Sequence, residues 1–278
     1  KTADSLVTKG EKAYFASYSG WFADAVLFDV GARADTVDFD QQNTLVSRSL
    51  ARTVFQNRSH QIGAFWKVVP EGGFFISYSQ AFKAPSVYDI FPLDTVWNVK
   101  NEDLQPEKAV TIERGMRWQL FSNLQLEASI YRTEVDDEIT LILNPTTWKG
   151  RNENMQSTLR NGKEISLEQK VNPCVSWRLG YASCEARYVD TVGGDFDGKY
   201  IPMVPEEDWK AGVTVKPIPG YTWGLDYIRV GRQFIDWDNA NDYDQLPAYQ
   251  VFNSRLNYAQ ENYLVYLDIY NIFNELYV

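Results

Sequence analysis

Alternation of apolar and polar residues is the feature that most limits how this 278-residue chain can fold. In one clear example, Leu124, Leu126 and Ile130 alternate with Gln125 and Glu127. The same pattern recurs in residues 26–35, 74–81, 110–118, 175–181, 209–216, 221–227 and 252–258. Because successive side chains of a strand point to opposite faces, this pattern predicts strands with one apolar face. No stretch of the sequence shows a comparable period of 3.6 residues, so we expect an all-β protein.

Tight turns and long polar segments follow each other in regular order. Turn-forming residues centre near positions 20, 71, 122, 173, 218 and 261, at intervals of 43 to 51 residues, and the first turn is assigned to Ser19, Gly20 and Trp21. Between the turns lie long polar segments around 40–60, 84–106, 143–156, 191–205 and 236–246. This order predicts six hairpins, and hence about twelve strands, with short turns at one end of a sheet and long loops at the other.

The character of the strands distinguishes two β architectures. A repeat of 40 to 50 residues also fits a β-propeller, but a blade needs four short strands where this chain offers two long ones. In the strand that begins at Leu124, the face that is apolar up to Ile130 carries Arg132, Glu134 and Asp136 beyond it. A strand that is apolar for part of its length and charged above is typical of a barrel wall that leaves a bilayer. We therefore expect a transmembrane antiparallel β-barrel.

The two faces of the expected strands differ in charge and in aromatic content. The face opposite the apolar one carries Asp29, Arg33, Glu113, Arg117, Glu127, Glu168, Lys210, Lys216 and Arg255. Because unpaired charges in a dry core are costly, this face must meet water or a polar filling. Aromatic residues make up 15% of the chain, and the apolar face includes Trp118, Trp177, Trp209, Tyr221 and Trp223. Several of them lie beside short turns, as an interfacial aromatic belt would.

Composition disfavours several other classes of protein. The net charge of −10 repels a phosphate backbone, so no nucleic-acid partner is expected. His60 is the only histidine, and Cys174 and Cys184 are expected to be free thiols, so neither a zinc site nor a disulfide framework is predicted. The sequence contains no nucleophile elbow, phosphate loop or metal-ligand cluster. It also has no apolar run long enough for a membrane helix. We predict neither an enzyme nor a bound cofactor.

Two motifs flanking one predicted loop make the chain resemble a known family. These are YSQAFKAPSVYD at residues 78–89 and NEDLQPEK at residues 101–108. Weaker matches follow in order: Trp21 with GARAD (31–35), IPMVP (201–205) before Trp209, LPAY (246–249) and DIYNIFNELYV (268–278). In this order the motifs resemble those of the TonB-dependent outer-membrane receptors. The resemblance implies a 22-stranded barrel around an N-terminal plug, which imports ferric siderophores or similar scarce nutrients with energy passed on by TonB.

The resemblance covers only part of such a receptor. Nothing in the chain resembles a plug or a TonB box, and the family would add one more strand after Val278. We therefore expect residues 1–278 to form the C-terminal portion of the barrel, about 12 of 22 strands. An open sheet of this size would expose two unpaired edges to lipid, so the missing strands are expected elsewhere. A twelve-stranded barrel that closes on itself is the alternative.

Ligand contacts are expected in the long loops. The candidates, which offer ring stacking and a guanidinium to a planar or anionic chelate, are Tyr88, Trp97, Trp148, Arg151, Trp237 and Tyr243. Residues 85–106 contain no histidine, which argues against the histidine-ligated haem site of haem-importing relatives. A weak calcium candidate comprises Asp236, Asp238, Asp242 and Asp244. It lacks the glycine and the terminal glutamate of an EF-hand loop, so a solvated acidic loop is the preferred interpretation.

Three functional hypotheses follow. The preferred one is an energised receptor of the bacterial outer membrane whose partners are an iron chelate or another small nutrient, TonB acting through a plug outside this chain, and outer-membrane lipid with lipopolysaccharide. The second is a passive channel or adhesin barrel, which predicts steady conductance in planar bilayers. The third is a soluble carbohydrate-binding propeller or sandwich, which predicts extraction without detergent.

Overall fold

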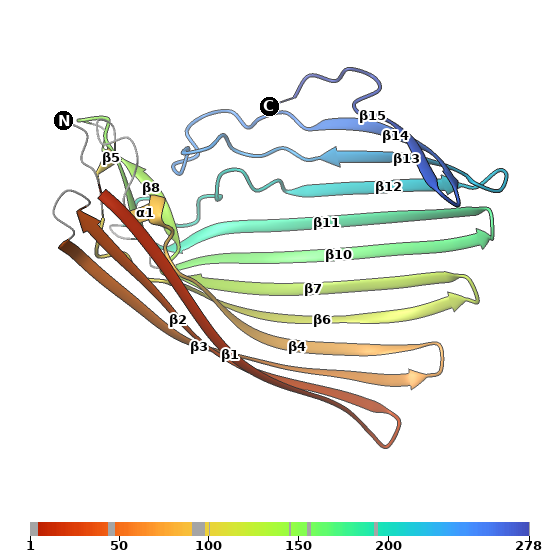
Figure 1. Cartoon of the computed structure of the whole chain (residues 1–278), viewed down its shortest axis with the longest axis horizontal. Coiled ribbons are helices and arrows are strands. Elements are labelled where there is room, and N and C mark those ends of the chain that lie inside the picture. Colours follow the sequence, from red (N-terminus) through yellow and green to blue (C-terminus); the bar gives the residue numbers. More distant parts are fainter. Residues whose placement is uncertain are drawn as a thin grey trace.

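The computed structural model describes residues 5–43, 48–90, 98–99, 101–144, 146–154, 157–191 and 194–277. It confirms the expected all-β class: twelve strands form one antiparallel sheet in which spatial order follows chain order. They are β1 (Ser5–Phe22), β2 (Val26–Asn43), β3 (Arg48–Val69), β4 (Gly72–Lys83), β6 (Glu107–Phe121), β7 (Leu124–Asp136), β10 (Ser157–Asn172), β11 (Val175–Asp190), β12 (Glu207–Val215), β13 (Tyr221–Val230), β14 (Tyr249–Gln260) and β15 (Tyr263–Ile269). Figure 1 shows short turns at one end of the sheet and long connections at the other.

A second, small sheet lies among the long connections and was not expected. It contains β5 (Asn98–Val99), β8 (Ile139–Leu143) and β9 (Gly150–Asn154), with β9 in the middle. One helical turn, α1 (Val87–Ile90), lies at the same end of the molecule (Figure 1). No helix among the described residues is long and apolar enough to span a membrane.

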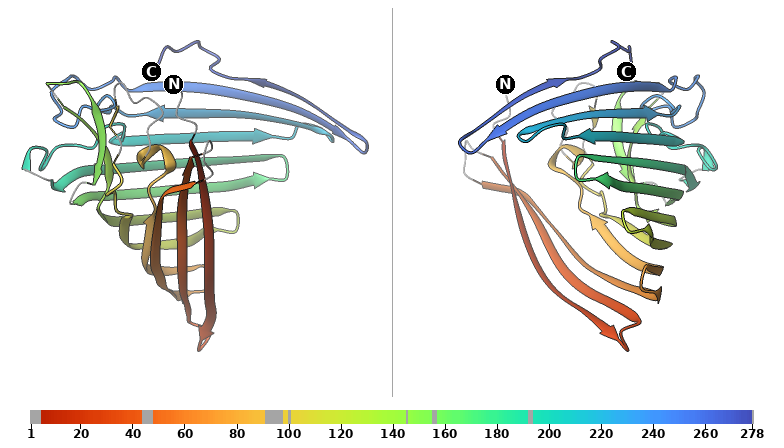
Figure 2. Two further views of the ribbon diagram at one scale, coloured as in Figure 1. Left: turned by 60° about the vertical axis from the view of Figure 1, so that its left-hand side comes forward. Right: turned by 90° about the vertical axis from the view of Figure 1, so that its right-hand side faces the viewer.

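The large sheet is curved and open. Its order begins with β1 and ends with β15, so in the described part of the chain these strands are its two edges. Figure 2 shows the curvature and the separation between the first and last strands. The alternative of a twelve-stranded barrel closed on itself is therefore wrong.

Strand register places the expected apolar residues on one face, called here the outer face. Directly opposed pairs include Phe74 with Met116, and Trp223 with Leu256. The five expected belt residues all share this face: their partners across the sheet are Leu126 for Trp118, Val213 for Trp177, Tyr181 for Trp209, Leu256 for Trp223 and Tyr258 for Tyr221. Large apolar residues of this face stay exposed, for example Ile76 at 55%. No second layer of described backbone covers them.

The opposite face, called the inner face, is lined by ion pairs between strands that are adjacent, as for Arg117 and Glu127, or separated by one strand, as for Arg178 and Asp226. Arg117 Nε lies 3.0 Å from Glu127 Oε2, and Arg178 Nη2 lies 2.5 Å from Asp226 Oδ1. These pairs are largely exposed, so each contributes only about 0–1 kcal/mol to stability. Their main effect is to neutralise charge on a face that meets water. The sequence predicted that this face would be charged.

Two boundaries differ from expectation. The first turn lies at residues 23–25 instead of 19–21, because β1 continues to Phe22 and positive φ angles of 50° and 54° fall on Ala23 and Asp24. Gly20 lies inside β1, where a Cβ would come within 2.5 Å of the Tyr18 hydroxyl oxygen, so this glycine makes room for a ring instead of a turn. The segment 40–60 is also mostly strand, since β2 and β3 extend well beyond the apolar band.

Candidate ligand-binding loops

The long connections form two clusters at one end of the sheet. The first loop cluster consists of the described parts of 84–106 and 137–154, and the second consists of those of 191–206 and 231–248. Hydrogen bonds link the loops within each cluster: Asn101 donates to the carbonyl of Asn152 in the first, and Asn241 donates to the carbonyl of Tyr200 in the second.

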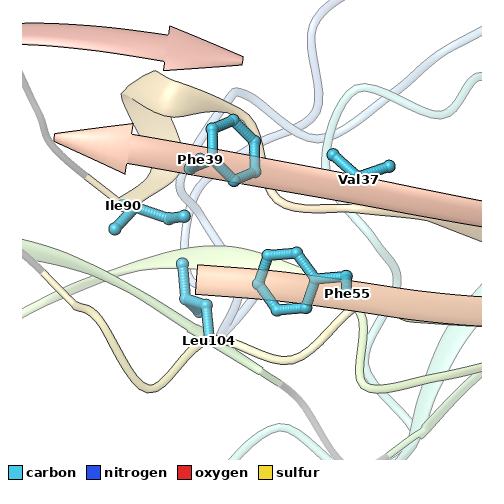
Figure 3. Packing of buried hydrophobic residues seen from close by; sticks show 5 residues of the cluster. All are labelled: Val37, Phe39, Phe55, Ile90 and Leu104. Carbon is cyan, nitrogen blue, oxygen red and sulfur yellow. The ribbon is translucent and has the colours of Figure 1, made fainter. Parts of the chain in front are cut away.

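A small hydrophobic core anchors the first loop cluster. Val37 and Phe39 of β2, Phe55 of β3, Ile90 of α1 and Leu104 are all buried and in contact (Figure 3). The rings of Phe39 and Phe55 meet edge to face with centroids 6.2 Å apart. Val37 and Phe39 lie on the inner face of β2, in the part of the strand that extends beyond the apolar band. Ile90 and Leu104 cover this part of the strand. Loop 84–106 therefore packs against the inner face near the ends of these strands.

Local hydrogen bonds shape the helical turn that presents Tyr88. Ser86 Oγ accepts a bond from the backbone N–H of Asp89 at 3.1 Å, and Asp89 Oδ2 accepts one from the backbone N–H of Ser86 at 2.7 Å. This reciprocal pair is a capping box, which satisfies backbone donors that a helix start leaves open. Tyr88 remains 63% exposed on this turn.

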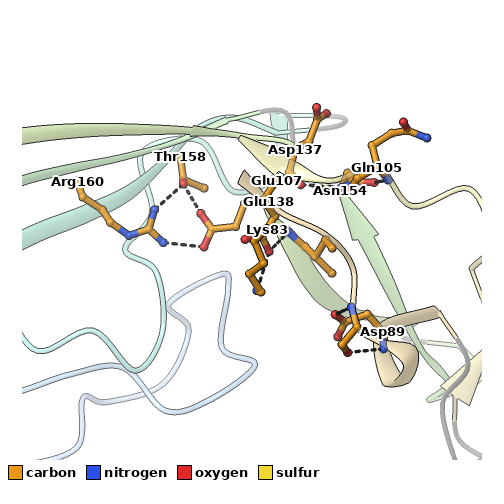
Figure 4. Close-up of polar contacts among 11 residues, drawn as sticks. Lys83, Asp89, Gln105, Glu107, Asp137, Glu138, Asn154, Thr158 and Arg160 are labelled. Carbon is orange, nitrogen blue, oxygen red and sulfur yellow. Dashed lines mark hydrogen bonds and ion pairs between the residues drawn. The ribbon is translucent and has the colours of Figure 1, made fainter. Parts of the chain in front are cut away.

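Asparagines from β9 fasten the NEDLQPEK motif to the neighbouring loop (Figure 4). Asn154 accepts a bond from the backbone N–H of Gln105 at 2.8 Å and donates to the carbonyl of Gln105 at 2.9 Å. Asn152 donates to the carbonyl of Asp89 at 3.1 Å, and Asn101 donates to the carbonyl of Asn152 at 2.8 Å. The NEDLQPEK motif therefore holds its loop against β9, a structural role that the sequence did not predict.

A partly buried charge network lies where the first loop cluster meets the sheet. Arg160 Nη2 lies 2.6 Å from Glu138 Oε1, and Arg160 Nη1 donates to Thr158 Oγ1 at 2.9 Å (Figure 4). Thr158, which is 1% exposed, also bonds Glu138. Glu107 accepts bonds from Lys83 Nζ at 3.0 Å and from a backbone N–H of β8 at 3.1 Å. These contacts join the start of β8 to β4, β6 and β10 of the large sheet.

Arg151 and Trp148 belong to the first loop cluster. Arg151 lies on β9, and its Nη1 is 3.6 Å from Glu153 Oε1, while its Nε is buried without a hydrogen-bond partner among the described residues. Trp148 lies in the turn between β8 and β9 with φ = 56°, and it is 68% exposed. Tyr88, Trp148 and Arg151 are thus gathered in one cluster. Trp97 lies outside the described residues.

Trp237 and Tyr243 come together in the second loop cluster. Their rings meet edge to face with centroids 6.4 Å apart, and they are 50% and 62% exposed. Asp238, only 4% exposed, accepts backbone N–H bonds from Asp242 at 2.9 Å and Tyr243 at 3.2 Å. Asp236 accepts the backbone N–H of Trp237 at 2.9 Å. The acidic side chains therefore shape the loop that presents the two rings.

This arrangement gives the calcium hypothesis no support. Asp238 is already engaged with the backbone of its own loop. The described residues also contain no group of three or more histidine, cysteine, aspartate or glutamate side chains that could hold a metal ion.

Tyr188 is a residue of this region that sequence reasoning missed. It lies near the end of β11, beyond the apolar band and thus outside the membrane-spanning part, and it is 2% exposed. Its hydroxyl donates to Asn239 Oδ1 at 2.9 Å, and its ring lies 6.0 Å from that of Phe196. Burial raises the pKa of Tyr188 to about 12. The sequence did not predict the contact between Tyr188 and Asn239, because the two residues are 51 positions apart and neither belongs to a recognisable motif.

Comparison with known proteins decides the family. The model of the TonB-dependent receptor-like β-barrel matches residues 5–272. The chain belongs to this family. As a member of it, this receptor chain is an outer-membrane β-barrel protein of Gram-negative bacteria, and its outer face meets lipid. The propeller and sandwich alternatives are therefore wrong.

The receptor chain has relatives among curated proteins and solved structures. It is 24% identical over 274 residues to the probable TonB-dependent siderophore receptor PiuA of Acinetobacter baumannii, covering 90% of this chain and 35% of PiuA. It is 23% identical over 224 residues to the catecholate siderophore receptor Fiu of Escherichia coli, covering 78% of this chain and 29% of Fiu. The crystal structure of PiuA superposes with a TM-score of 0.75 at 21% identity, covering 99% of this chain and 40% of that one. The receptor chain thus spans about a third of the length of these curated relatives.

Proposed function

We propose that this chain supplies part of the barrel wall and ligand-facing loops of a receptor that imports a ferric siderophore. Residues 1–278 are then the C-terminal portion of the barrel, in line with the two open sheet edges and with the fraction of PiuA that the chain covers. TonB would act through a plug outside these residues. Support for an iron-chelate ligand comes from the names of PiuA and Fiu and from the chemistry of the loops.

The observation that carries this proposal is a set of exposed aromatic rings, together with the partly exposed guanidinium of Arg151, on loops that are anchored to the sheet. Tyr88, Trp148, Trp237 and Tyr243 are each at least half exposed, although their loops are fixed by hydrogen bonds or packing. Planar rings stack on aromatic chelating groups, and an arginine bonds anionic oxygens in a forked geometry. The Arg151 side chain is 43% exposed and its Nη1 lies 3.6 Å from Glu153 Oε1, so its exposed N–H groups are available to an anionic ligand oxygen. A passive pore has no need of such groups.

The first test is ligand binding by the full-length protein in detergent. A ferric catecholate should quench tryptophan fluorescence with saturation, and Arg151→Ala should weaken binding roughly tenfold or more, the loss of one charge-assisted hydrogen bond. Lys170→Ala, an exposed cation next to a short turn at the other end of the sheet, is the control and should leave binding unchanged. Quenching by cobalamin but not by the ferric catecholate would overturn the siderophore assignment, since the vitamin B12 transporter BtuB of Vibrio cholerae is also a relative, at 26% identity over 267 residues.

The second test separates import from passive conduction. Uptake of radioactive iron by iron-starved cells should disappear when TonB is deleted, whereas binding to the cells should persist. Uptake that continues without TonB, or steady conductance of the purified protein in planar bilayers, would contradict the proposal and favour a passive channel.

A further inference from the structure

Two cations on the outer face flank one exposed isoleucine at the edge of the apolar band. Arg114 of β6 and Lys163 of β10 lie directly opposite Ile130 of β7, one on each side. Neighbouring strands are about 4.8 Å apart, so the Cα atoms of the two cations are about 10 Å apart, within reach of one shared anion for side chains of this length. Both are exposed.

Lys163 lies where the wall leaves the hydrocarbon on the side of the long loops, whereas on β6 the outer face carries Ile112 and Val110 beyond Arg114 before it becomes charged at Lys108. On β7 the outer face changes from Ala128 and Ile130 to Arg132. On β10 it changes from Ile165 to Lys163 in the same direction. The level at which β7 and β10 become charged is where lipid headgroups meet a membrane protein. Lys163 lies at this level, and Arg114 lies level with Ile130, from where an arginine side chain is long enough to extend its charged end toward the headgroups.

Neither Arg114 nor Lys163 forms a salt bridge with another residue that the structure describes. Two acidic side chains of the neighbouring outer face are engaged with other arginines. Glu134 accepts bonds from Arg132, at 3.0 and 2.6 Å, and Glu185 accepts one from Arg187 Nε at 2.6 Å. Arg114 and Lys163 therefore have no salt-bridge partner among the described residues, although Glu206 adds a negative charge to the lining of the groove beside them.

The surface around the cations is hollowed in two connected grooves. One, of about 720 Å³, is lined by Arg114, Ile130 and Lys163 together with polar groups that include Arg132 and Asn161; Glu206, also in its lining, accepts a bond from Gln245 at 3.3 Å. The other, of about 480 Å³, shares the same three residues and is otherwise mainly apolar on the outer face, with Phe74, Met116, Ala128 and Ile165. A polar groove and an apolar groove that meet at two cations match an amphiphile with an anionic head.

We propose that this patch binds an anionic membrane lipid, with a headgroup phosphate between Arg114 and Lys163 and an acyl chain in the apolar groove beside Ile130. Charge complementarity selects the phosphate, since phosphate oxygens accept bonds from both cations. The apolar groove selects a lipid over a free phosphate. The proposal depends on the position of the barrel in the outer membrane and is independent of which nutrient the receptor imports.

The test uses the delipidated full-length protein and native mass spectrometry, with bis-phosphorylated lipid A as the probe. Each cation near a membrane surface contributes about 1 kcal/mol, so each single alanine variant should weaken binding about fivefold and Arg114→Ala with Lys163→Ala about 25-fold. The matched control is Arg178→Ala with Lys210→Ala, which removes the same residue types and the same charge from the inner face. It should bind lipid A like the wild type.

Competition identifies the source of the phosphate. Phosphatidylcholine, whose headgroup has no net charge, should compete poorly, and inorganic phosphate should not displace lipid A at equal concentration. Equal losses in the two double variants, full retention in Arg114→Ala with Lys163→Ala, or displacement by inorganic phosphate would overturn the proposal. A protein dimer that only this double variant abolishes would assign the patch to a second copy of the chain instead.

Discussion

The two loop clusters are anchored to the same wall by different forces. The first loop cluster packs Ile90 and Leu104 onto Val37, Phe39 and Phe55, and the buried core is reinforced by a charge network. The second loop cluster combines ring contacts, such as Tyr200 with Phe234, with hydrogen bonds from Tyr188 to Asn239 and within the acidic loop. Burial of apolar side chains contributes more per residue than a single hydrogen bond, so the first cluster should resist perturbation better and the second should respond to smaller changes.

The largest expected effect comes from opening the core of the first loop cluster. Leu104→Ala removes a side chain that is 2% exposed and should destabilise the docked loop by about 2–5 kcal/mol. Hydrogen exchange of residues 84–90 should rise sharply, while exchange in 236–244 stays unchanged. The control is Ile218→Ala, which truncates a residue 58% exposed beside a short turn. Equal protection of 84–90 in both variants would show that the core does not anchor the loop.

Loss of the charge network should have the next largest effect. Glu138→Gln leaves Arg160, whose side chain is 24% exposed, without its counterion, at a cost of about 1.5–3 kcal/mol. Faster exchange should appear in β8 and β9, because Glu138 directly precedes β8. Glu134→Gln, which also removes an arginine partner but on an exposed site, is the control and should change little. If both variants behave alike, burial of the pair is not what matters.

Alkaline pH should release the second loop cluster selectively. The pKa of Tyr188 is raised to about 12 by burial, so between pH 10 and 12 the detached state loses its proton first and docking weakens as pH rises. The loss is at most about 1.4 kcal/mol for each pH unit. Proteolysis within 236–244 should therefore increase over this range in the wild type. In Tyr188→Phe this pH-dependent component should be missing, and its persistence would assign it to another group.

The smallest effect is expected from the Tyr188 hydroxyl at neutral pH. Tyr188→Phe keeps the ring against Phe196 but leaves Asn239 without its donor, which should cost about 0.5–1.5 kcal/mol of loop docking. Hydrogen exchange of 236–244 should rise modestly, with residues 84–90 unaffected. Tyr266→Phe, a change at a 65% exposed ring on β15, provides the matched control. A larger response in the first cluster than in the second would reverse the comparison between them.

Sequence patterning was informative wherever a strand faces two different media. Period-two alternation located eight of the twelve strands, and the spacing of the turns predicted the total of about twelve. Alternation also placed Trp118, Trp177 and Trp223 on one face, which the register confirms. The assignment of turns from residue type failed at Gly20, where a glycine that suggested a turn instead accommodates the Tyr18 ring inside β1. A local motif cannot separate these two uses of glycine, because the ring that requires the space comes from two residues away on the same strand.

The candidate ligand residues were predicted less completely than the wall. Tyr88, Trp148 and Arg151 were chosen by chemistry, and the structure gathers them in one cluster, while Trp237 and Tyr243 meet in the other; their contact with a ligand stays a prediction. The small sheet, the role of Asn154 and the contact of Tyr188 were not predictable. Each of these three features depends on contacts between residues that are far apart in the sequence, and loop sequences have no periodic pattern from which such contacts could be predicted.

The sequence by itself determined which residues of each strand face lipid and which face water, because alternation is a local property of an extended backbone. Only the tertiary structure decided how the loops fold over the inner face, which asparagines hold the NEDLQPEK motif, and that Arg114 and Lys163 share one isoleucine. Those arrangements depend on sheet register and on contacts between segments about 20 to 60 residues apart, and their energies exist only once the strands have paired.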